Sequence, residues 1–302
     1  MQLPPFFNPS NDMALAANVR QYFPPRRIQQ MESDLASLAR FWDEGPWGWS
    51  LATREHYLRM GIPSSFLPSD DYLAELRRLS SRQFGVEYYK ALLASLPEPI
   101  LLPCQARCCT AIDEIKPPII LKSLWSSSGR GNIVVEESPD ASTLLRVKRI
   151  LREQGGIVVE PFYADKVLDF AMEFDVSDDG TRFLGYSVFE ADDVGHYGGN
   201  YVESQESLLR RIALPSDLLA RLVSHHQSAL AALPYRGPVG IDMMRLSDGR
   251  VHPCVEVNFR MTMGLLALLL YKKGIRDDQL LTPDHPEGFT ARIHRSKLMI
   301  KV

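Results

Sequence analysis

The pattern of apolar positions is least regular over about the first 80 residues, where it indicates several short helices. Within 27–42, Ile28, Met31 and Leu35 follow one another at intervals of three and four positions, which predicts an amphipathic helix. Further helices are expected at 51–60 and 70–79, and a short one after Asn11, whose side chain is expected to cap it. The pattern therefore predicts a short, mostly helical N-terminal region.

The next part of the chain alternates between helices and short apolar strands. Pro117-Pro118 precede a clear strand, and a loop of small residues separates this strand from the next one. Asp140 or Ser138 is expected to cap the helix that follows, and Gly155 is expected to end it. The elements expected here are a helix at 81–94, strands at 100–102, 119–122 and 132–136, and the capped helix.

From Gly156 onwards the pattern becomes that of strands joined by tight turns. Turn residues at 178–180 and 247–249 predict two β-hairpins. The expected strands are 157–160, 168–176, 182–189, 240–246, 251–258 and one within 289–301, and the expected helices are 217–233, capped by Ser216, and 262–273. The chain therefore begins with helices and continues with hairpins that further helices cover. This order of elements indicates the α+β class.

Composition and charge exclude several classes of protein. The chain has 302 residues, 45% hydrophobic and 24% charged, which argues against a disordered, collagen-like or coiled-coil protein. A length of this size suggests about two domains. The 34 Lys and Arg against 37 Asp and Glu give a net charge of −3. No basic surplus indicates a nucleic-acid or membrane partner, although a small anion could still bind in one pocket.

We expect neither a signal peptide, nor a membrane-spanning segment, nor a disulfide framework in this chain. Prolines interrupt its start, no basic segment precedes an apolar one, and the apolar run 263–271 is shorter than the about 20 residues that span a bilayer. A soluble, cytoplasmic protein is therefore expected. Its four cysteines are expected to be free thiols, because His252 and Cys254 form only half of a zinc-binding pattern.

Lys122, near the end of a predicted strand, is the first candidate for chemistry. The sequence SLWSSSGRG follows it, and such small residues let successive backbone N–H groups approach an anion. The lysine would add a point charge for a phosphate. No G-K-[ST] closes the loop and no helix starts directly after Gly131, so neither a Walker A nor a dinucleotide-binding motif is present. A Gly/Ser hairpin loop beside an unrelated lysine is the alternative.

The second candidate is the acidic hairpin. Glu256 and Asn258 lie two residues apart and share one face of a strand, and the predicted turn brings Asp242 within reach of Glu256. Arg260 continues the same face. Carboxylate and amide oxygens suit Mg²⁺ that bridges nucleotide phosphates, and an arginine can neutralise charge on a transferred phosphoryl group. An ordinary amphipathic hairpin is the alternative.

Together these motifs resemble the ATP-grasp superfamily. Its members carry, in order, a phosphate-binding lysine, a Gly-rich flap, a glutamate at a hinge strand, a later acidic residue and an E-x-N-x-R strand. The corresponding segments are IILK (119–122), SSSGRG (126–131), VVEPF (158–162), GIDMM (240–244) and VEVNFR (255–260). The last segment is similar to the metal-binding strand of biotin carboxylase-like and carbamoyl-phosphate-synthase-like members. The resemblance covers about residues 81–270.

The resemblance implies an α+β ATP-grasp fold in which two lobes clasp ATP near Glu160. The expected parts are an N-terminal region (1–80), a small lobe with the phosphate flap (81–155) and a C-terminal lobe with the metal site (156–302). In relatives the N-terminal region is a small α/β domain. Here it shows no βαβ pattern, and no role follows for it.

The resemblance also implies a role for each matched residue. Lys122 would bind the α- and β-phosphates, and Arg260 would hold the γ-phosphate or an acyl phosphate, so both are candidate catalytic residues. Arg82 would replace an earlier lysine that members carry in an S-D-K-like sequence. The other implied contacts are Ser126, Ser127, Ser128, Gly129, Arg130 and Gly131 in the flap, Glu160, Pro161 and Phe162 at adenine, Asp169 at the ribose, and Asp242, Glu256 and Asn258 at the metal.

Two further groups of residues have expected positions. His196, Tyr197 and Asn200 follow the first hairpin, where relatives often place a substrate-facing loop, and they are candidate substrate contacts; a plain mobile loop is the alternative. Three tryptophans are expected to pack the N-terminal region against the rest of the chain, namely Trp42, Trp47 and Trp49.

The function implied by the resemblance is that of an ATP-dependent ligase using Mg²⁺ or Mn²⁺, with two ions. It would activate a small-molecule carboxylate as an acyl phosphate for attack by an amine or a similar nucleophile. A homodimer is the assembly found in many relatives. A kinase-like phosphotransferase is one alternative. A non-catalytic nucleotide-binding or regulatory protein is the other, although the complete set of Asp242, Glu256 and Asn258 argues against it.

Overall fold

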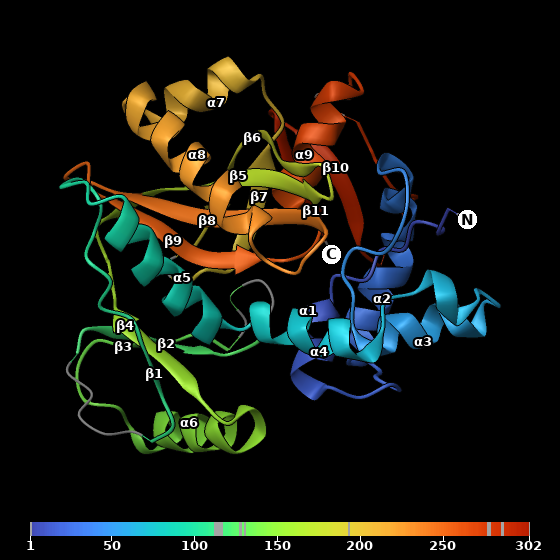
Figure 1. The fold of residues 1–302 in the computed structure, drawn as a ribbon, viewed down its shortest axis with the longest axis horizontal. Coiled ribbons are helices and arrows are strands. Elements are labelled where there is room, and N and C mark those ends of the chain that lie inside the picture. The colour runs from blue at the N-terminus through green and yellow to red at the C-terminus, as the bar shows by residue number, and fades with distance from the viewer. Residues whose placement is uncertain are drawn as a thin grey trace.

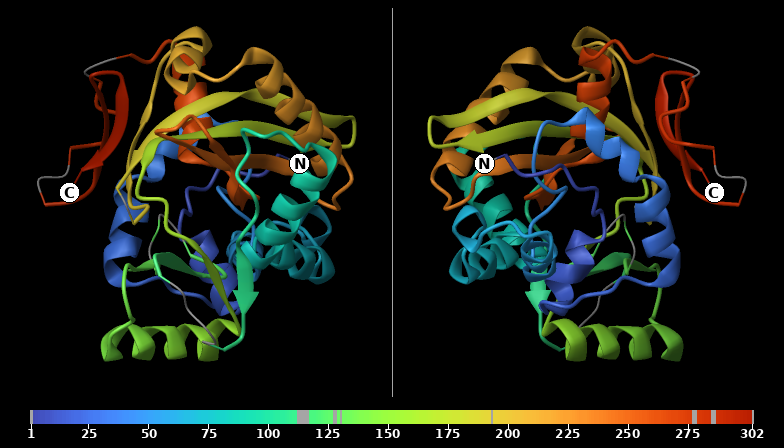
Figure 2. Two further views of the ribbon diagram at one scale, coloured as in Figure 1. Left: turned by 90° about the vertical axis from the view of Figure 1, so that its left-hand side faces the viewer. Right: turned by 90° about the vertical axis from the view of Figure 1, so that its right-hand side faces the viewer.

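Two antiparallel sheets and the helices around them make up the computed structural model (Figure 1). The structure describes residues 2–111, 117–126, 129, 131–192, 194–276, 279–284 and 287–301. No helix in this described part of the chain is both long and apolar enough to cross a membrane. The small sheet and its helix lie below the large sheet in the views of Figure 2.

The N-terminal region is helical, as expected. It contains α1 (Asn11–Ala17), α2 (Arg26–Asp34), η1 (Ala36–Phe41), α3 (Leu51–Arg59), η2 (Ser64–Phe66) and α4 (Asp70–Leu79), where η marks a 3₁₀ helix.

The single helix predicted over 27–42 is wrong, because the chain leaves the α-helical conformation at Leu35. The buried Asp34 carboxylate accepts a hydrogen bond from the backbone N–H of Phe289, and this distant contact fixes where α2 ends. Asn11 is not a cap either, since it is the first residue of α1 and Ser10 occupies the cap position.

The small sheet has the strand order β1-β4-β2-β3, with α6 packed on one face. Its elements, with the preceding helix, are α5 (Arg82–Ser95), β1 (Arg107–Cys109), β2 (Ile119–Ser123), β3 (Ile133–Val135), α6 (Ala141–Gln154) and β4 (Ile157–Pro161). Asp140 caps α6, as one of the two expected residues, by accepting from the N–H of Thr143. The strand expected at 100–102 is wrong, because only Leu101 forms an isolated bridge, with Val251.

The large sheet has the order β10-β11-β7-β6-β5-β8-β9. Its strands are β5 (Lys166–Ser177), β6 (Gly180–Ala191), β7 (Tyr197–Tyr201), β8 (Gly237–Leu246), β9 (Val251–Asn258), β10 (Thr290–His294) and β11 (Lys297–Lys301), and its helices are α7 (Gln205–Ile212), α8 (Ser216–Ala231) and α9 (Met263–Lys272). Both predicted hairpins are confirmed. The tail forms a hairpin rather than one strand. The sequence did not predict α7, and Ser216 begins α8 instead of capping it.

The two faces of the large sheet differ in polarity because side chains alternate along each strand. On β5, Phe170, Met172 and Phe174 point to one face, where they join a core with apolar residues of α4, α5, α7 and α8. The alternate positions include Asp169 and Glu173 and point to the opposite face. Helix α9 partly covers that face, where it contacts β5, β6 and β7.

The tryptophans join the N-terminal region to α9. Trp47 lies 5.8 Å from Trp42 and 5.3 Å from Phe7 between ring centroids, and these rings share a core with Leu266 of α9. This confirms the packing role expected for Trp42 and Trp47. The half-buried Trp49 packs against Tyr57 and the main core, so it also joins the N-terminal region to the rest of the chain.

Replacing Leu266 by Ala should reveal how much this junction contributes to stability. Leu266 is fully buried, so we expect the free energy of unfolding to fall by about 2–5 kcal/mol from lost contacts and a residual cavity. Urea denaturation would measure it. Leu145 on α6 is 68% exposed, and its replacement by Ala should change stability by less than about 0.5 kcal/mol. Similar losses in both variants would contradict this role of α9.

Candidate functional site

Paired positions on the large sheet assemble the acidic part of the site. Asp242 on β8 pairs with Glu256 on β9 and, on its other side, with Ala171 on β5. In the next row, Gly240 pairs with both Asn258 and Glu173. Cross-strand partners and alternate residues of a strand point to the same face. The register therefore gathers three carboxylates and an amide on the face opposite the main core.

The carboxylates of Asp242 and Glu256 suit a divalent cation. Burial, together with the nearby Glu256 and Glu173, raises the pKa of Asp242 to about 8. The Asn258 amide donates to Asp242 Oδ2 at 3.0 Å, and its oxygen accepts from Arg260 at 2.8 Å. A cation between these oxygens would relieve the repulsion. No group of three or more His, Cys, Asp or Glu within the described ranges could hold a metal, so phosphate or water oxygens would complete this set.

Arg260 is held in place by a residue that the sequence did not identify. Its Nε lies 3.0 and 3.1 Å from the two carboxylate oxygens of Asp12, and its Nη2 lies 2.9 Å from one of them. Asp12 belongs to the first turn of α1 and is buried. The N-terminal region thus reaches the end of β9 and fixes the guanidinium beside Asn258.

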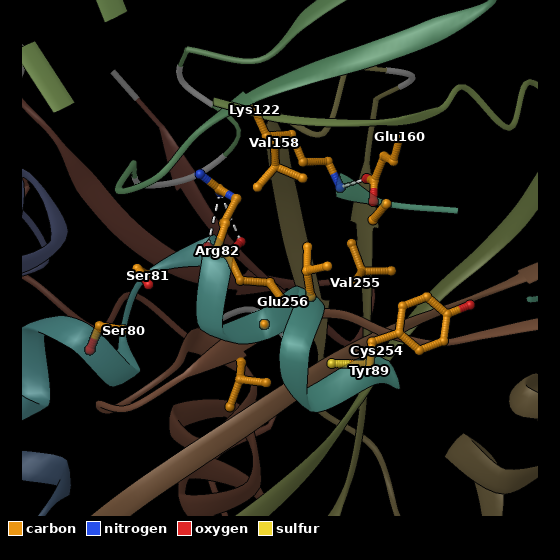
Figure 3. A pocket seen from close by; sticks show the side chains of 14 residues that line it. Ser80, Ser81, Arg82, Tyr89, Lys122, Val158, Glu160, Cys254, Val255 and Glu256 are labelled. Carbon is orange, nitrogen blue, oxygen red and sulfur yellow. Dashed lines mark hydrogen bonds and ion pairs between the residues drawn. The ribbon is translucent and has the colours of Figure 1, made fainter. Parts of the chain in front are cut away.

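Lys122 and Glu160 lie on adjacent strands of the small sheet and form a buried ion pair (Figure 3). His252 lies close to this pair, with its Nε2 3.9 Å from Glu160 Oε2. Burial lowers the pKa of His252 to about 4, so this imidazole is neutral at pH 7. Lys122, rather than His252, therefore balances the charge of Glu160 in this pair.

Arg82 connects the two sheets. It is the first residue of α5, which Ser81 caps by accepting from the N–H of Phe84. The guanidinium donates to the carbonyl of Ser123 and to Ser126 Oγ, both at 2.7 Å, and forms an ion pair with Glu256 at 2.9 Å (Figure 3). Arg82, Lys122, Glu160 and Glu256 line the same pocket. Arg82 therefore pairs with a carboxylate of the large sheet, whereas Lys122 and Glu160 pair within the small sheet.

The residues expected to contact adenine and ribose lie on β4, just after it, and on β5. Pro161 ends β4, and the N–H of Phe162 donates to the carbonyl of Pro118. Asp169 lies on the same face of β5 as Glu173, and its carboxylate is 2.8 Å from Lys166 Nζ. Burial raises the pKa of Asp169. The roles expected for these residues at adenine and ribose stay predictions.

Only part of the flap falls within the described residues. Ser127, Ser128 and Arg130 lie outside them. Gly129 has a φ of +69°, and a Cβ there would lie 2.3 Å from the carbonyl oxygen of Gly195, so this position favours glycine. Gly129 therefore packs on the segment that precedes β7.

A second pocket extends from Asp242 and Glu256 over the start of α9. Tyr197 and Asn200, two of the three candidate substrate contacts, line it from β7, so this part of the expected loop is a strand. The third, His196, is exposed, and its Nδ1 lies 2.8 Å from Asp192 Oδ2. The sequence did not identify the other lining residues, which include Phe7, Met31 and Trp47 from the N-terminal region, Ser187 and Phe189 from β6, and Glu173 and Thr262.

Neither protein-family models nor curated proteins match this chain. Among solved structures, it is similar to Rhizobium etli pyruvate carboxylase at 14% identity and a TM-score of 0.49, covering 64% of this chain and 17% of that one. It is also similar to biotin carboxylase from Campylobacter jejuni (15%, TM-score 0.46, 74% and 50%) and to L-amino acid ligase from Bacillus licheniformis (16%, TM-score 0.44, 71% and 48%). The chain spans half or less of the length of these structures.

The geometry agrees with the order of motifs in the sequence. Lys122 on β2, Glu160 on β4 and the acidic pair on β8 and β9 follow one another along the chain as in the proteins that the sequence resembles. The structure brings Lys122, Glu160 and Glu256 to one pocket between two antiparallel sheets. The described residues form antiparallel sheets flanked by helices, which confirms the expected α+β class.

Proposed function

We propose that this protein is a ligase that uses ATP and Mg²⁺ to activate a carboxylate as an acyl phosphate, which an amine then attacks. One observation carries the proposal: Arg82 and Lys122 share a pocket with Glu256, which is paired with Asp242. Two cations and two carboxylates that could bind a metal would then surround the phosphates of a bound ATP. The parts 1–80, 81–155 and 156–302 would act as the N-terminal region and the two lobes of this enzyme.

Each residue would contribute to phosphoryl transfer by position and charge. Asp242, Glu256 and Asn258 would hold Mg²⁺, which neutralises charge on the phosphates. Lys122 would bind the phosphates. Arg82 would hold Glu256 in place and would also lie close to the phosphates. Arg260, oriented by Asp12, would stabilise the phosphoryl group as it moves to the carboxylate. No covalent intermediate on a side chain is needed.

The test is ADP release with panels of carboxylic acids and primary amines, with products identified by mass spectrometry. We expect an amide product, and trapping by hydroxylamine should give a hydroxamate from the acyl phosphate. Lys122→Met should lower kcat/KM for ATP by about 100-fold, because a buried charge contact to phosphate is lost. Lys148→Met, on the exposed side of α6, should leave it unchanged.

Other products would contradict the proposal. A product that retains the phosphoryl group would identify a phosphotransferase instead. Calorimetric binding of ATP without ADP formation across both panels would identify a nucleotide-binding protein without this activity. In either case, the affinity of the Lys122→Met variant for ATP would show independently whether Lys122 binds the nucleotide.

A further inference from the structure

Glu173 is a buried carboxylate on the floor of the second pocket. Only 1% of its surface is exposed, yet it lines the pocket together with Arg260. Ser187 Oγ donates to Oε1 and Thr262 Oγ1 donates to Oε2, both at 2.8 Å. No ion pair joins Glu173 to a basic side chain among the residues that the structure describes. The carboxylate is therefore oriented by hydroxyl groups. Burial raises its pKa to about 7, and the nearby Arg260, with which it forms no ion pair, acts to lower that pKa.

The surrounding backbone makes room for this carboxylate. A Cβ on Gly264, in the first turn of α9, would lie 2.1 Å from Glu173 Oε1, and one on Gly240 would lie 2.9 Å from Oε2. Two glycines on separate elements thus accommodate an acidic side chain. Burying a carboxylate without a cation is costly. A role in packing alone would be filled better by an apolar side chain.

The position of Glu173 within the site indicates which reactant it would meet. Moving along β5 from Asp169 through Ala171 to Glu173 follows the sheet from the expected ribose to the row of Asn258. Glu173 therefore lies at the phosphoryl-transfer end of the site. A carboxylate substrate would be repelled by Glu173, whereas a cation would be attracted.

Part of the wall of the second pocket is apolar and aromatic. Phe7, Trp47 and Phe189 line it together with Tyr197. The Tyr197 hydroxyl is buried and has no hydrogen-bond partner among the described residues. An anionic floor, apolar walls and a free hydroxyl fit a ligand that combines a charged amine with an apolar group.

We propose that the second pocket binds the nucleophile as a primary amine carried on an apolar or aromatic group, with Glu173 binding its ammonium. This inference rests on the proposed function, because it assumes that an amine attacks a carboxylate activated near Arg260. It extends that function by naming the class of amine and the residue that selects it.

The experiment measures binding of 2-phenylethylamine and of its neutral analogue, 2-phenylethanol, by ligand-detected NMR. The full-length protein would be studied both alone and saturated with Mg²⁺ and a non-hydrolysable ATP analogue. We expect the amine to bind more tightly than the alcohol, and Glu173→Gln to weaken the amine by at least about tenfold while leaving the alcohol unchanged. Glu206→Gln changes the net charge equally on the exposed surface of α7 and should have no effect.

Equal binding of the two compounds to the unmodified protein would overturn the proposal without any variant. An unchanged amine affinity in Glu173→Gln would also overturn it. Glutamine keeps the shape of the side chain and its contacts with both hydroxyls, and thermal unfolding would verify that the variant folds. Failure of the proposed function would appear differently: the ATP analogue would not bind, or no acyl phosphate would form, while the amine titration without nucleotide would still report on Glu173.

Discussion

Replacing Asp242 by Asn should abolish turnover and stabilise the metal-free protein at the same time. The substitution removes one of the two carboxylates that would bind Mg²⁺, so we expect kcat to fall by about 1,000-fold or more. It also removes a buried negative charge that lies beside Glu256 and Glu173. The free energy of unfolding at pH 8 should therefore rise, by about 2 kcal/mol.

The stability gained by Asp242→Asn should depend on pH, because it depends on whether Asp242 is ionised. Burial raises the pKa of Asp242 from 3.8 to about 8, so the folded protein retains a proton that the unfolded chain loses. The contribution of Asp242 to stability therefore decreases as the pH rises from about 4 to about 8. Urea denaturation in chelator should show a gain for Asp242→Asn at pH 8 and little gain near pH 4.

A matched control separates the site from a general effect of charge. Asp179 is exposed in the turn between β5 and β6, so Asp179→Asn should alter neither turnover nor stability measurably. Retained turnover in Asp242→Asn would refute the assignment of the metal site. A loss of stability in chelator would instead show that the carboxylate contributes favourable contacts without the ion.

The acidic pair could be predicted because local turn chemistry fixes the register of a hairpin. Ser247-Asp248-Gly249 form the turn between β8 and β9, and this turn brings Asp242 opposite Glu256. The same logic predicted the hairpin of β5 and β6. Helix α6 was predictable from its apolar spacing, the Asp140 cap and the terminal Gly155.

The features that the sequence did not predict depend on distant contacts. The end of α2 depends on Asp34 and the backbone of Phe289, and the orientation of Arg260 depends on Asp12, which is 248 positions away in the chain. Glu173 could be placed on one face of a strand by alternation. Its place in a pocket required Thr262 and the N-terminal aromatic residues, whose positions no local pattern specifies.

Asp12 and Arg260 should behave as one energetic unit. Asp12→Asn would leave a buried guanidinium without its carboxylate, so we expect the free energy of unfolding to fall by about 3 kcal/mol or more. Because Arg260 would lose its fixed orientation, kcat should also fall, by about tenfold or more, while the affinity for ATP changes less. Urea denaturation and steady-state kinetics would measure these two effects.

A double-mutant cycle with Arg260→Gln tests whether the two residues act through each other. The double variant should lose much less stability than the sum of the single variants, because removing both charges leaves neither one buried alone. The exposed pair Glu75 and Arg78 on α4 provides the comparison, and Glu75→Gln should cost less than about 1 kcal/mol. Additive losses for Asp12 and Arg260 would mean that the N-terminal region does not orient Arg260. The first 80 residues would then contribute to the site through the walls of the second pocket alone.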